Sequence, residues 1–150
     1  MDCRACPSIR GEARISPGPI IWQSPLWIVD HAYPTSLPGW VVIEPRRHVE
    51  ELHALTAGEW ADYAVLLPAV VTALRDVTGC AKEYVVCLAE AEGFKHIHFH
   101  VVPRMADQPE SLTGPRVFGY LNPAPGEEVP AERVTALSEQ LTARLRELLG

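Results

Sequence analysis

The sequence predicts an α+β fold, in which a mostly antiparallel sheet of five strands is covered by a long helix and a C-terminal helix. Three β-rich runs come before a long helical segment, and two come after it. Short connections join the runs within each group, and a single helical crossover separates the groups. This order is typical of an antiparallel sheet with helices packed on it. The 150 residues have the length of one domain, so we expect a single domain over residues 1–150.

The strands are predicted from β-branched and aromatic runs that end at Pro, Gly or polar residues. PGPIIWQ (17–23) and PLWIVDHAY (25–33) are separated by a short polar break and predict a hairpin. The turn SLPGW (36–40) leads into a third run, WVVIEP, and two more runs follow the helical segment. We expect strands near residues 18–23, 26–32, 40–45, 83–89 and 96–102.

The two helices are predicted from their caps and their apolar spacing. Thr56 and Glu59 have the spacing of a capping box, and Gly79 ends the periodic segment. A helix is therefore expected over most of residues 57–78. Near the C-terminus, Val134, Leu137 and Leu141 begin an amphipathic pattern, which predicts a helix over most of residues 131–148.

Composition excludes several classes of function. The net charge of −6 and the pI near 5.5 leave no basic surface for nucleic acid. The longest apolar run, residues 63–74, is shorter than the ~20 residues that span a membrane. The N-terminal residues contain no apolar signal core, so we expect a cytoplasmic protein without nucleic acid or membrane partners. In that reducing compartment the four cysteines are interpreted as metal ligands or core residues rather than disulfides.

The run HIHFHVV (96–102) is the most informative stretch. On a strand, His96, His98 and His100 would share one face, with apolar residues on the other. Three interpretations stand at this point: an incidental polar face, a catalytic zinc held by the imidazoles, or an imidazole nucleophile.

A CxxC sequence indicates metal binding near the N-terminus. Cys3 and Cys6 form a two-thiolate clamp that needs two further ligands, and the chain has no second CxxC. Cys80 and Cys87 are flanked by apolar residues and are expected in the core. The missing ligands are then histidines, which would make a closed, structural Cys2His2 site. The alternative is a pair of free surface thiols.

The histidine run resembles the H-φ-H-φ-H-φ-φ signature of the histidine triad (HIT) superfamily of nucleotide hydrolases and transferases. IVDHAYPTSLPGWVVIEPRRH (28–48) resembles the family's strand, turn, strand and P-K/R-x-H segment. The resemblance covers about residues 3–104, and residues 130–149 form a helical extension without a matching motif. It implies the HIT-like fold, a nucleotide or nucleotide-conjugate substrate, and a homodimer.

The resemblance also implies roles for individual residues. His98 would attack the α-phosphorus to form a nucleotidyl-histidine, and His100 would contact the phosphate oxygens. Zinc-containing relatives, including galactose-1-phosphate uridylyltransferase, bind metal through a CxxC, the histidine after the P-x-x sequence and the first histidine of the triad. These positions imply one structural Zn²⁺ held by Cys3, Cys6, His48 and His96.

Other positions depart from the family pattern or are ambiguous. Trp40 follows Gly39 where many members have a histidine, and EGFKH (92–96) replaces the usual Gln or Ser before the triad. Lys95 is interpreted as a phosphate contact or a solvated lysine. Asp30 or His31 would contact the ribose, and His53 competes as a fourth zinc ligand. Three arginines are either phosphate contacts or surface residues: Arg46, Arg47 and Arg104.

The leading hypothesis is a HIT-type nucleotide phosphohydrolase or nucleotidyl transferase. It would act at the α-phosphate through a nucleotidyl-histidine intermediate. Two alternatives stay open, namely a metal-dependent hydrolase that uses the triad as zinc ligands, and a nucleotide-binding module without catalytic activity.

Overall fold

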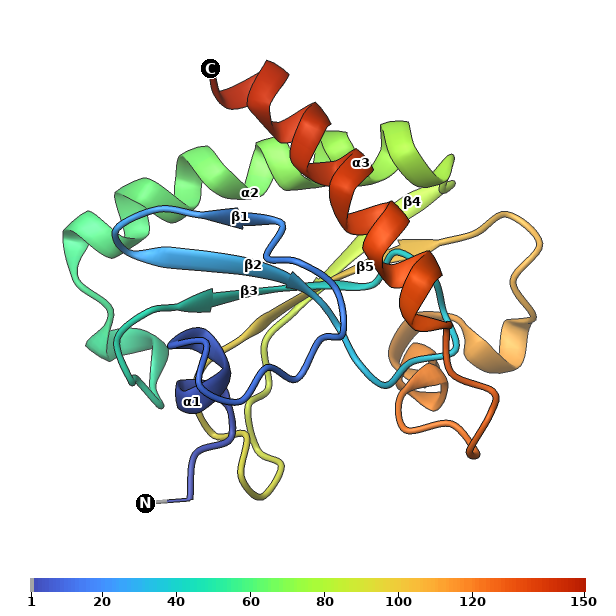
Figure 1. Ribbon diagram of the computed structural model, residues 1–150, viewed down its shortest axis with the longest axis horizontal. Coiled ribbons are helices and arrows are strands. Elements are labelled where there is room, and N and C mark those ends of the chain that lie inside the picture. The colour runs from blue at the N-terminus through green and yellow to red at the C-terminus, as the bar shows by residue number, and fades with distance from the viewer. Residues whose placement is uncertain (1) are drawn as a thin grey trace.

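The computed structural model describes residues 2–150 and contains the expected five-stranded antiparallel sheet. Its strands lie in the order β1-β2-β3-β5-β4, so β1 and β4 form the two edges (Figure 1). Every neighbouring pair is antiparallel. This confirms the α+β, HIT-like fold class. The strands are β1 (Trp22–Gln23), β2 (Trp27–His31), β3 (Val41–Pro45), β4 (Lys82–Val86) and β5 (Phe99–Arg104).

Two long helices pack against one face of the sheet, as Figure 1 shows: α2 (Ala57–Thr78) and α3 (Ala131–Leu149). The Thr56 hydroxyl accepts from the Glu59 amide, and the Glu59 carboxylate accepts from the Thr56 amide, so the predicted capping box is present. Gly79 ends α2 in the left-handed conformation, at φ 71°. One short helix, α1 (Ala5–Ile9), was not expected. Short 3-10 helices are η1 (Leu52–Ala54), η2 (Glu110–Leu112) and η3 (Gly114–Tyr120).

The alternation of strand side chains separates a core face from a second face. Trp27, Ile43 and Val101 are fully buried under α2 and α3, together with Leu74 and Leu145 from those helices. The other face is covered at its two ends only. α1 packs on Ile28, and η3 packs on a cluster that includes Trp40 and Val102. The surface between these two covers is left open for a site.

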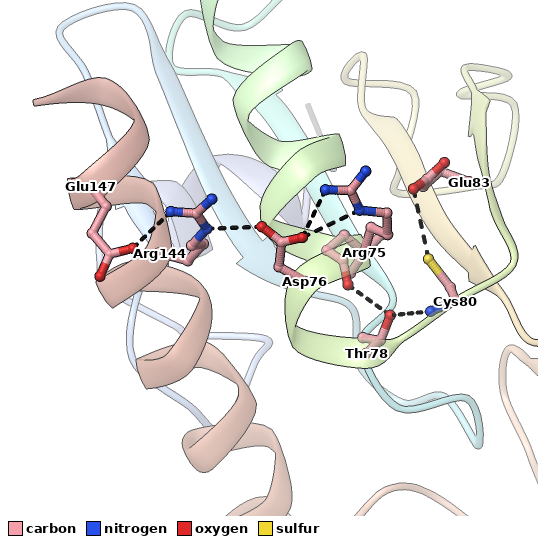
Figure 2. Close-up of polar contacts among 8 residues, drawn as sticks. Arg75, Asp76, Thr78, Cys80, Glu83, Arg144 and Glu147 are labelled. Atoms are coloured by element: carbon pink, nitrogen blue, oxygen red, sulfur yellow. Dashed lines mark hydrogen bonds and ion pairs between the residues drawn. The ribbon is translucent and has the colours of Figure 1, made fainter.

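Polar contacts join the C-terminal part of α2 to α3 (Figure 2). Asp76 accepts from Arg75 at 2.9 Å and from Arg144 of α3 at 2.9 Å, and Arg144 also donates to Glu147 at 2.7 Å. These ion pairs lie at the surface, where each is worth about 0–1 kcal/mol. Beside them Cys80 is buried, as expected, and Cys87 packs against the main core.

Three strand boundaries differ from the prediction. The strand expected over 18–23 is only Trp22–Gln23, because Pro17 and Pro19 lack the amide hydrogens that a ladder needs. The strand expected over 83–89 ends at Val86. The strand expected to start at His96 begins at Phe99, because the Ile97 amide donates to Val49 outside the ladder. His96 and His98 therefore precede the strand. Among residues 2–150, none of the helices has the length and apolar character to cross a membrane.

Candidate active site and metal centre

Cys3, Cys6, His48 and His96 come together from three separate segments of the chain. Cys3 precedes α1, and Cys6 lies within it. His48 follows β3, and His96 precedes β5. Their potential ligand atoms all lie within 4.8 Å of one another. The Cys6 Sγ is 3.2 Å from the His48 Nδ1 and 3.6 Å from the His96 Nδ1. Tetrahedral zinc bonds of ~2.0–2.3 Å imply separations of about 3.3–3.8 Å between ligands, so the group has the size of a zinc site.

The hydrogen bonds of the His48 and His96 Nε2 atoms show which ring nitrogen of each residue is free to bind a metal. The His96 Nε2 lies 2.8 Å from the Pro45 carbonyl, and the His48 Nε2 lies 3.2 Å from a Glu50 carboxylate oxygen. Both partners only accept, so both Nε2 atoms carry the proton. The two Nδ1 atoms are then bare lone pairs, and they face each other at 3.3 Å. Two lone pairs at that distance repel, and a cation between them removes the repulsion.

The thiols fit the same conclusion. Burial raises the pKa of Cys6 to about 11, and its contact with Cys3 adds to the shift. A thiolate at this position therefore needs a positive partner, which a bound metal supplies. Burial also lowers the pKa of His96, which keeps that ring neutral as a ligand must be. His53, the competing candidate, is exposed in η1 and lies outside this group.

A cavity of about 340 Å³ opens on the sheet face opposite the helices. Val42 of β3 forms part of its floor, and Phe94 and Phe118 contribute apolar walls. Its polar lining includes His98, His100 and the carboxyl groups of Asp30 and Glu44. A mostly apolar hollow of this size with a few polar groups is typical of a small-molecule site.

His98 presents a free ring nitrogen. Its Nδ1 lies 2.8 Å from the carbonyl oxygen of His96, which can only accept, so Nδ1 carries the proton. The Nε2 atom then has a lone pair, and no hydrogen bond within residues 2–150 engages it. The ring is half-buried and lines the cavity. This hydrogen bond selects, for the neutral form of the ring, the tautomer that can act as a nucleophile.

His100 is held in the opposite tautomer by Trp40. The Trp40 indole Nε1–H donates to the His100 Nδ1 at 3.0 Å. Indole nitrogen can only donate, so the neutral His100 ring carries its proton on Nε2. Burial, and to a smaller extent the charge of His98, lower the pKa of His100 to about 3. His100 is thus a neutral hydrogen-bond donor across the physiological range.

Asp30 and His31 line the cavity, but both have partners within the chain. Both Asp30 oxygens accept from Arg14, each at 2.6 Å, and burial raises the pKa of Asp30 although Arg14 opposes that shift. The His31 Nδ1 donates to Ala32 O, and its Nε2 accepts from the Gly39 amide. His31 therefore has no free ring nitrogen. Lys95 is exposed and is not among the residues that line the cavity.

The three arginines have different contacts. Arg47 pairs with Glu59 at 3.0 Å, and Arg46 donates to Gln23. Arg104 lies at the end of β5 and donates to the Met105 carbonyl. None of the three is among the lining residues of the cavity.

Three residues at or beside the cavity were not predicted from the sequence. Trp40 looked only like a departure from the family pattern, yet it fixes the tautomer of His100. Arg14 holds Asp30 and was not considered. Glu44 is an acidic residue within the apolar run WVVIEP. That isolated acid was the one available signal.

The comparisons with known proteins agree with this geometry. The family model for the HIT domain matches residues 16–107. A Zn-bound histidine triad family protein from Mycobacterium smegmatis is 18% identical, with 97% of this chain and 94% of that chain covered and a TM-score of 0.70. A hypothetical histidine triad nucleotide-binding protein from Sulfolobus tokodaii is 15% identical, with 97% and 93% covered and a TM-score of 0.73.

A Hit-like protein involved in cell-cycle regulation from Bartonella henselae, with an unknown ligand, is 16% identical over 92% of both chains, at a TM-score of 0.68. At these identities the likeness establishes the fold. No curated protein sequence matches the chain. The family model covers more than half of the chain and spans the histidine motif and strands β3 and β5. The chain belongs to the HIT domain family.

Proposed function

We propose that this protein is a HIT-type nucleotide hydrolase or nucleotidyl transferase that uses His98 as its nucleophile. The observation that carries the proposal is the orientation of the His98 ring. Its Nδ1–H is tied to the backbone at 2.8 Å, and its Nε2 lone pair is free on the cavity side. An imidazole fixed in this tautomer can attack without first losing a proton. Membership in the HIT family gives the nucleotide as the substrate class.

In the proposed reaction the His98 Nε2 attacks the α-phosphorus of a bound nucleotide conjugate. A P–N bond forms as the bond to the leaving group breaks, and the nucleotidyl-histidine is then resolved by water or another acceptor. The His100 Nε2–H donates to a phosphate oxygen. Because Trp40 and burial keep that proton in place, the donor is organised before the substrate arrives.

We further propose that Cys3, Cys6, His48 and His96 hold one structural Zn²⁺. Four such ligands would fill the tetrahedral coordination of zinc and leave no open position for water. The site joins the N-terminal α1 to the ends of β3 and β5. The same residue, His96, offers its ring to the metal and its carbonyl oxygen to the His98 Nδ1–H. Metal binding would therefore stabilise the orientation of the nucleophile.

This geometry favours the nucleotidyl-histidine route over a metal-dependent hydrolase. His98 and His100 are not in the four-residue metal group, and both residues line the cavity. A module without catalytic activity would use the same cavity but would form no covalent adduct.

The direct test is to incubate the protein with nucleoside phosphoramidates, dinucleoside polyphosphates and nucleotide sugars, and to measure the released monophosphate. Rapid quenching followed by mass spectrometry of peptides should place a nucleotidyl group on His98. Nucleotide binding with neither turnover nor adduct would contradict the proposal and favour the binding module.

We also propose that the protein forms a homodimer through a sheet edge. β4 is an edge strand of five residues, and its Val85 is 43% exposed. Edge strands with free backbone groups are usually covered or paired. Light scattering at micromolar concentration should give twice the mass of the chain, and the mass of one chain would contradict the proposal.

A further inference from the structure

Glu44 lies beside the proposed nucleophile, on the neighbouring strand. The β3–β5 ladder pairs Val42 with His100 and Ile43 with Phe99. Glu44 and His98 are the next residues beyond this ladder, since His98 precedes β5. Opposite residues of an antiparallel pair have Cβ atoms about 4.5–5.5 Å apart and diagonal neighbours about 7–8 Å, so a glutamate at this position lies within side-chain reach of the cavity around His98. Both side chains line the same cavity.

Glu44 is also the half-buried carboxyl group of the cavity that lacks a partner within residues 2–150. Asp30 lies on the same face of the sheet, but Arg14 occupies both of its oxygens. Glu90, at the cavity rim, is exposed. Glu44 is half-buried, and among residues 2–150 no hydrogen bond or ion pair reaches its carboxyl. A carboxyl group in this setting is available to a ligand.

The surroundings of Glu44 favour its protonated form. Burial raises its pKa to about 8, the charge of Asp30 adds to the shift, and Arg14 opposes it. The other titratable groups that line the cavity are His31, Tyr33, His98, His100 and Glu90. Of these, His31 and His100 are kept neutral by burial. The nearby metal group would contribute little net charge, because Zn²⁺ with two thiolates and two neutral imidazoles is neutral.

The proposed reaction needs a proton donor in this place. An oxygen leaving group departs as an anion unless it gains a proton. An amine departs poorly unless its nitrogen is protonated. The His98 Nε2 is used in the new P–N bond, and its Nδ1–H is held by the His96 carbonyl. His100 is directed at the phosphate. Among the carboxyl groups that line the cavity, that of Glu44 is half-buried and has no partner within residues 2–150.

We propose that Glu44 is the general acid and base of the reaction, an inference that rests on the proposed function. In the first step its O–H proton passes to the leaving group as the P–N bond to His98 forms and the bond to the leaving group breaks. In the second step the Glu44 carboxylate takes a proton from the attacking water as the new P–O bond forms and the P–N bond breaks. Glu44 is then protonated again, and His98 is again free of the nucleotidyl group.

The test compares two substrates with the same nucleoside 5′-phosphate. One is an ester of 4-nitrophenol, which leaves without protonation, and the other is an ester of an aliphatic alcohol, which needs a proton. Glu44→Gln should lower turnover of the aliphatic ester by about 10²-fold or more, the usual contribution of general acid–base catalysis. Formation of the adduct from the nitrophenyl ester should change far less, and its hydrolysis should be slow.

The variant should therefore release a burst of nitrophenolate equal to the enzyme concentration. In the wild type, turnover of the aliphatic ester should fall as pH rises through about 8, the pKa of Glu44, and Glu44→Gln should lack this fall. Glu110→Gln, an exposed acid in η2, is the matched control and should behave as the wild type.

Equal losses on both esters, or an increase in KM alone, would overturn the inference in favour of a positioning role. Wild-type turnover of the aliphatic ester by Glu44→Gln, with the His98 adduct still forming, would overturn the inference and leave the proposed function intact. An absence of turnover and adduct with either ester in the wild type would overturn both.

Discussion

Two neighbouring pairs of histidines differ in their ring protons: both rings of one pair carry the proton on Nε2, whereas the two rings of the other pair carry it on different nitrogens. In the metal group, His48 and His96 use Nε2 as the donor and face each other with bare Nδ1 atoms at 3.3 Å. In the cavity, His98 donates from Nδ1 and His100 accepts at Nδ1. All four rings are imidazoles within a short distance of one another. Their different chemistry comes from the partner that each ring meets.

The comparison shows how a repeated motif supports separate functions. His96, His98 and His100 alternate in the sequence, but their hydrogen-bond partners are the Pro45 carbonyl, the His96 carbonyl and the Trp40 indole. Each partner has a fixed donor or acceptor character, so each assigns one tautomer. Under the proposed function, the first pair would share a cation, His98 would attack, and His100 would donate.

The largest expected effect is the loss of turnover in a variant of the cavity pair, with the metal group left intact. His98→Asn should lower turnover by about 10³-fold or more, because the covalent route disappears. It should keep one zinc per chain and the wild-type Tm, since His98 is not in the metal group. Steady-state kinetics, elemental analysis and thermal melting provide the three measurements. His53→Asn, at an exposed position, is the matched control and should retain activity, zinc and stability.

His48→Asn is expected to have the reverse effect, with a larger loss of metal and stability than of turnover. This change removes a proposed zinc ligand and should reduce metal content well below one per chain. It should lower Tm by about 10 °C, given that 1 kcal/mol corresponds to about 2–4 °C in a chain of this size and that structural zinc contributes several kcal/mol. Residual turnover should exceed that of His98→Asn. Unchanged metal content would show that the ligands lie elsewhere.

A smaller effect is expected from Trp40→Phe. Loss of the indole donor leaves the His100 Nδ1 without its partner, so the ring no longer favours the Nε2–H tautomer. A lost hydrogen bond of about 1–1.5 kcal/mol corresponds to a fall in kcat/KM of about 10-fold. Trp60→Phe changes a partly exposed tryptophan (38%) on α2 and is the control. The tautomer role is contradicted if both variants have the same kcat/KM as the wild type.

The last expected effect concerns stability in acid rather than activity. The pKa of His100 in the folded protein is about 3, below its ordinary value of 6.5. Between these two values the unfolded chain binds a proton that the folded chain does not. The free energy of unfolding should therefore fall as pH falls from about 6.5 towards 3, by at most about 1.4 kcal/mol per pH unit from this residue. Urea unfolding at several pH values should show a shallower fall for His100→Asn.

The fold was accessible from the sequence because local signals carried it. Thr56, Glu59 and Gly79 mark the ends of α2 through contacts within a few residues. The strand runs were found for the same reason, although Pro17 and Pro19 shortened the first one. The start of β5 was wrong by three residues, because the alternation of His96 to His100 continues through a segment whose backbone pairs with Val49 instead of the sheet.

The site was accessible only in part. The resemblance to the family selected Cys3, Cys6, His48 and His96, and the structure brings all four together. The partners of the cavity residues come from distant segments. Trp40 is 60 positions from His100, and Arg14 is 16 positions from Asp30. Neither pairing has a local signal in the sequence. The two candidate ribose contacts, Asp30 and His31, could not be separated for the same reason.

The central claim, that ring partners assign the four histidines their roles, is tested most directly by ¹⁵N NMR of the imidazoles in protein labelled at histidine. Two-bond proton–nitrogen correlations identify which ring nitrogen carries the proton. The account predicts protonated Nε2 in His48, His96 and His100, protonated Nδ1 in His98, and a neutral ring for His100 at pH 7.5. A His98 ring protonated on Nε2, or a His100 ring protonated on Nδ1, would contradict it.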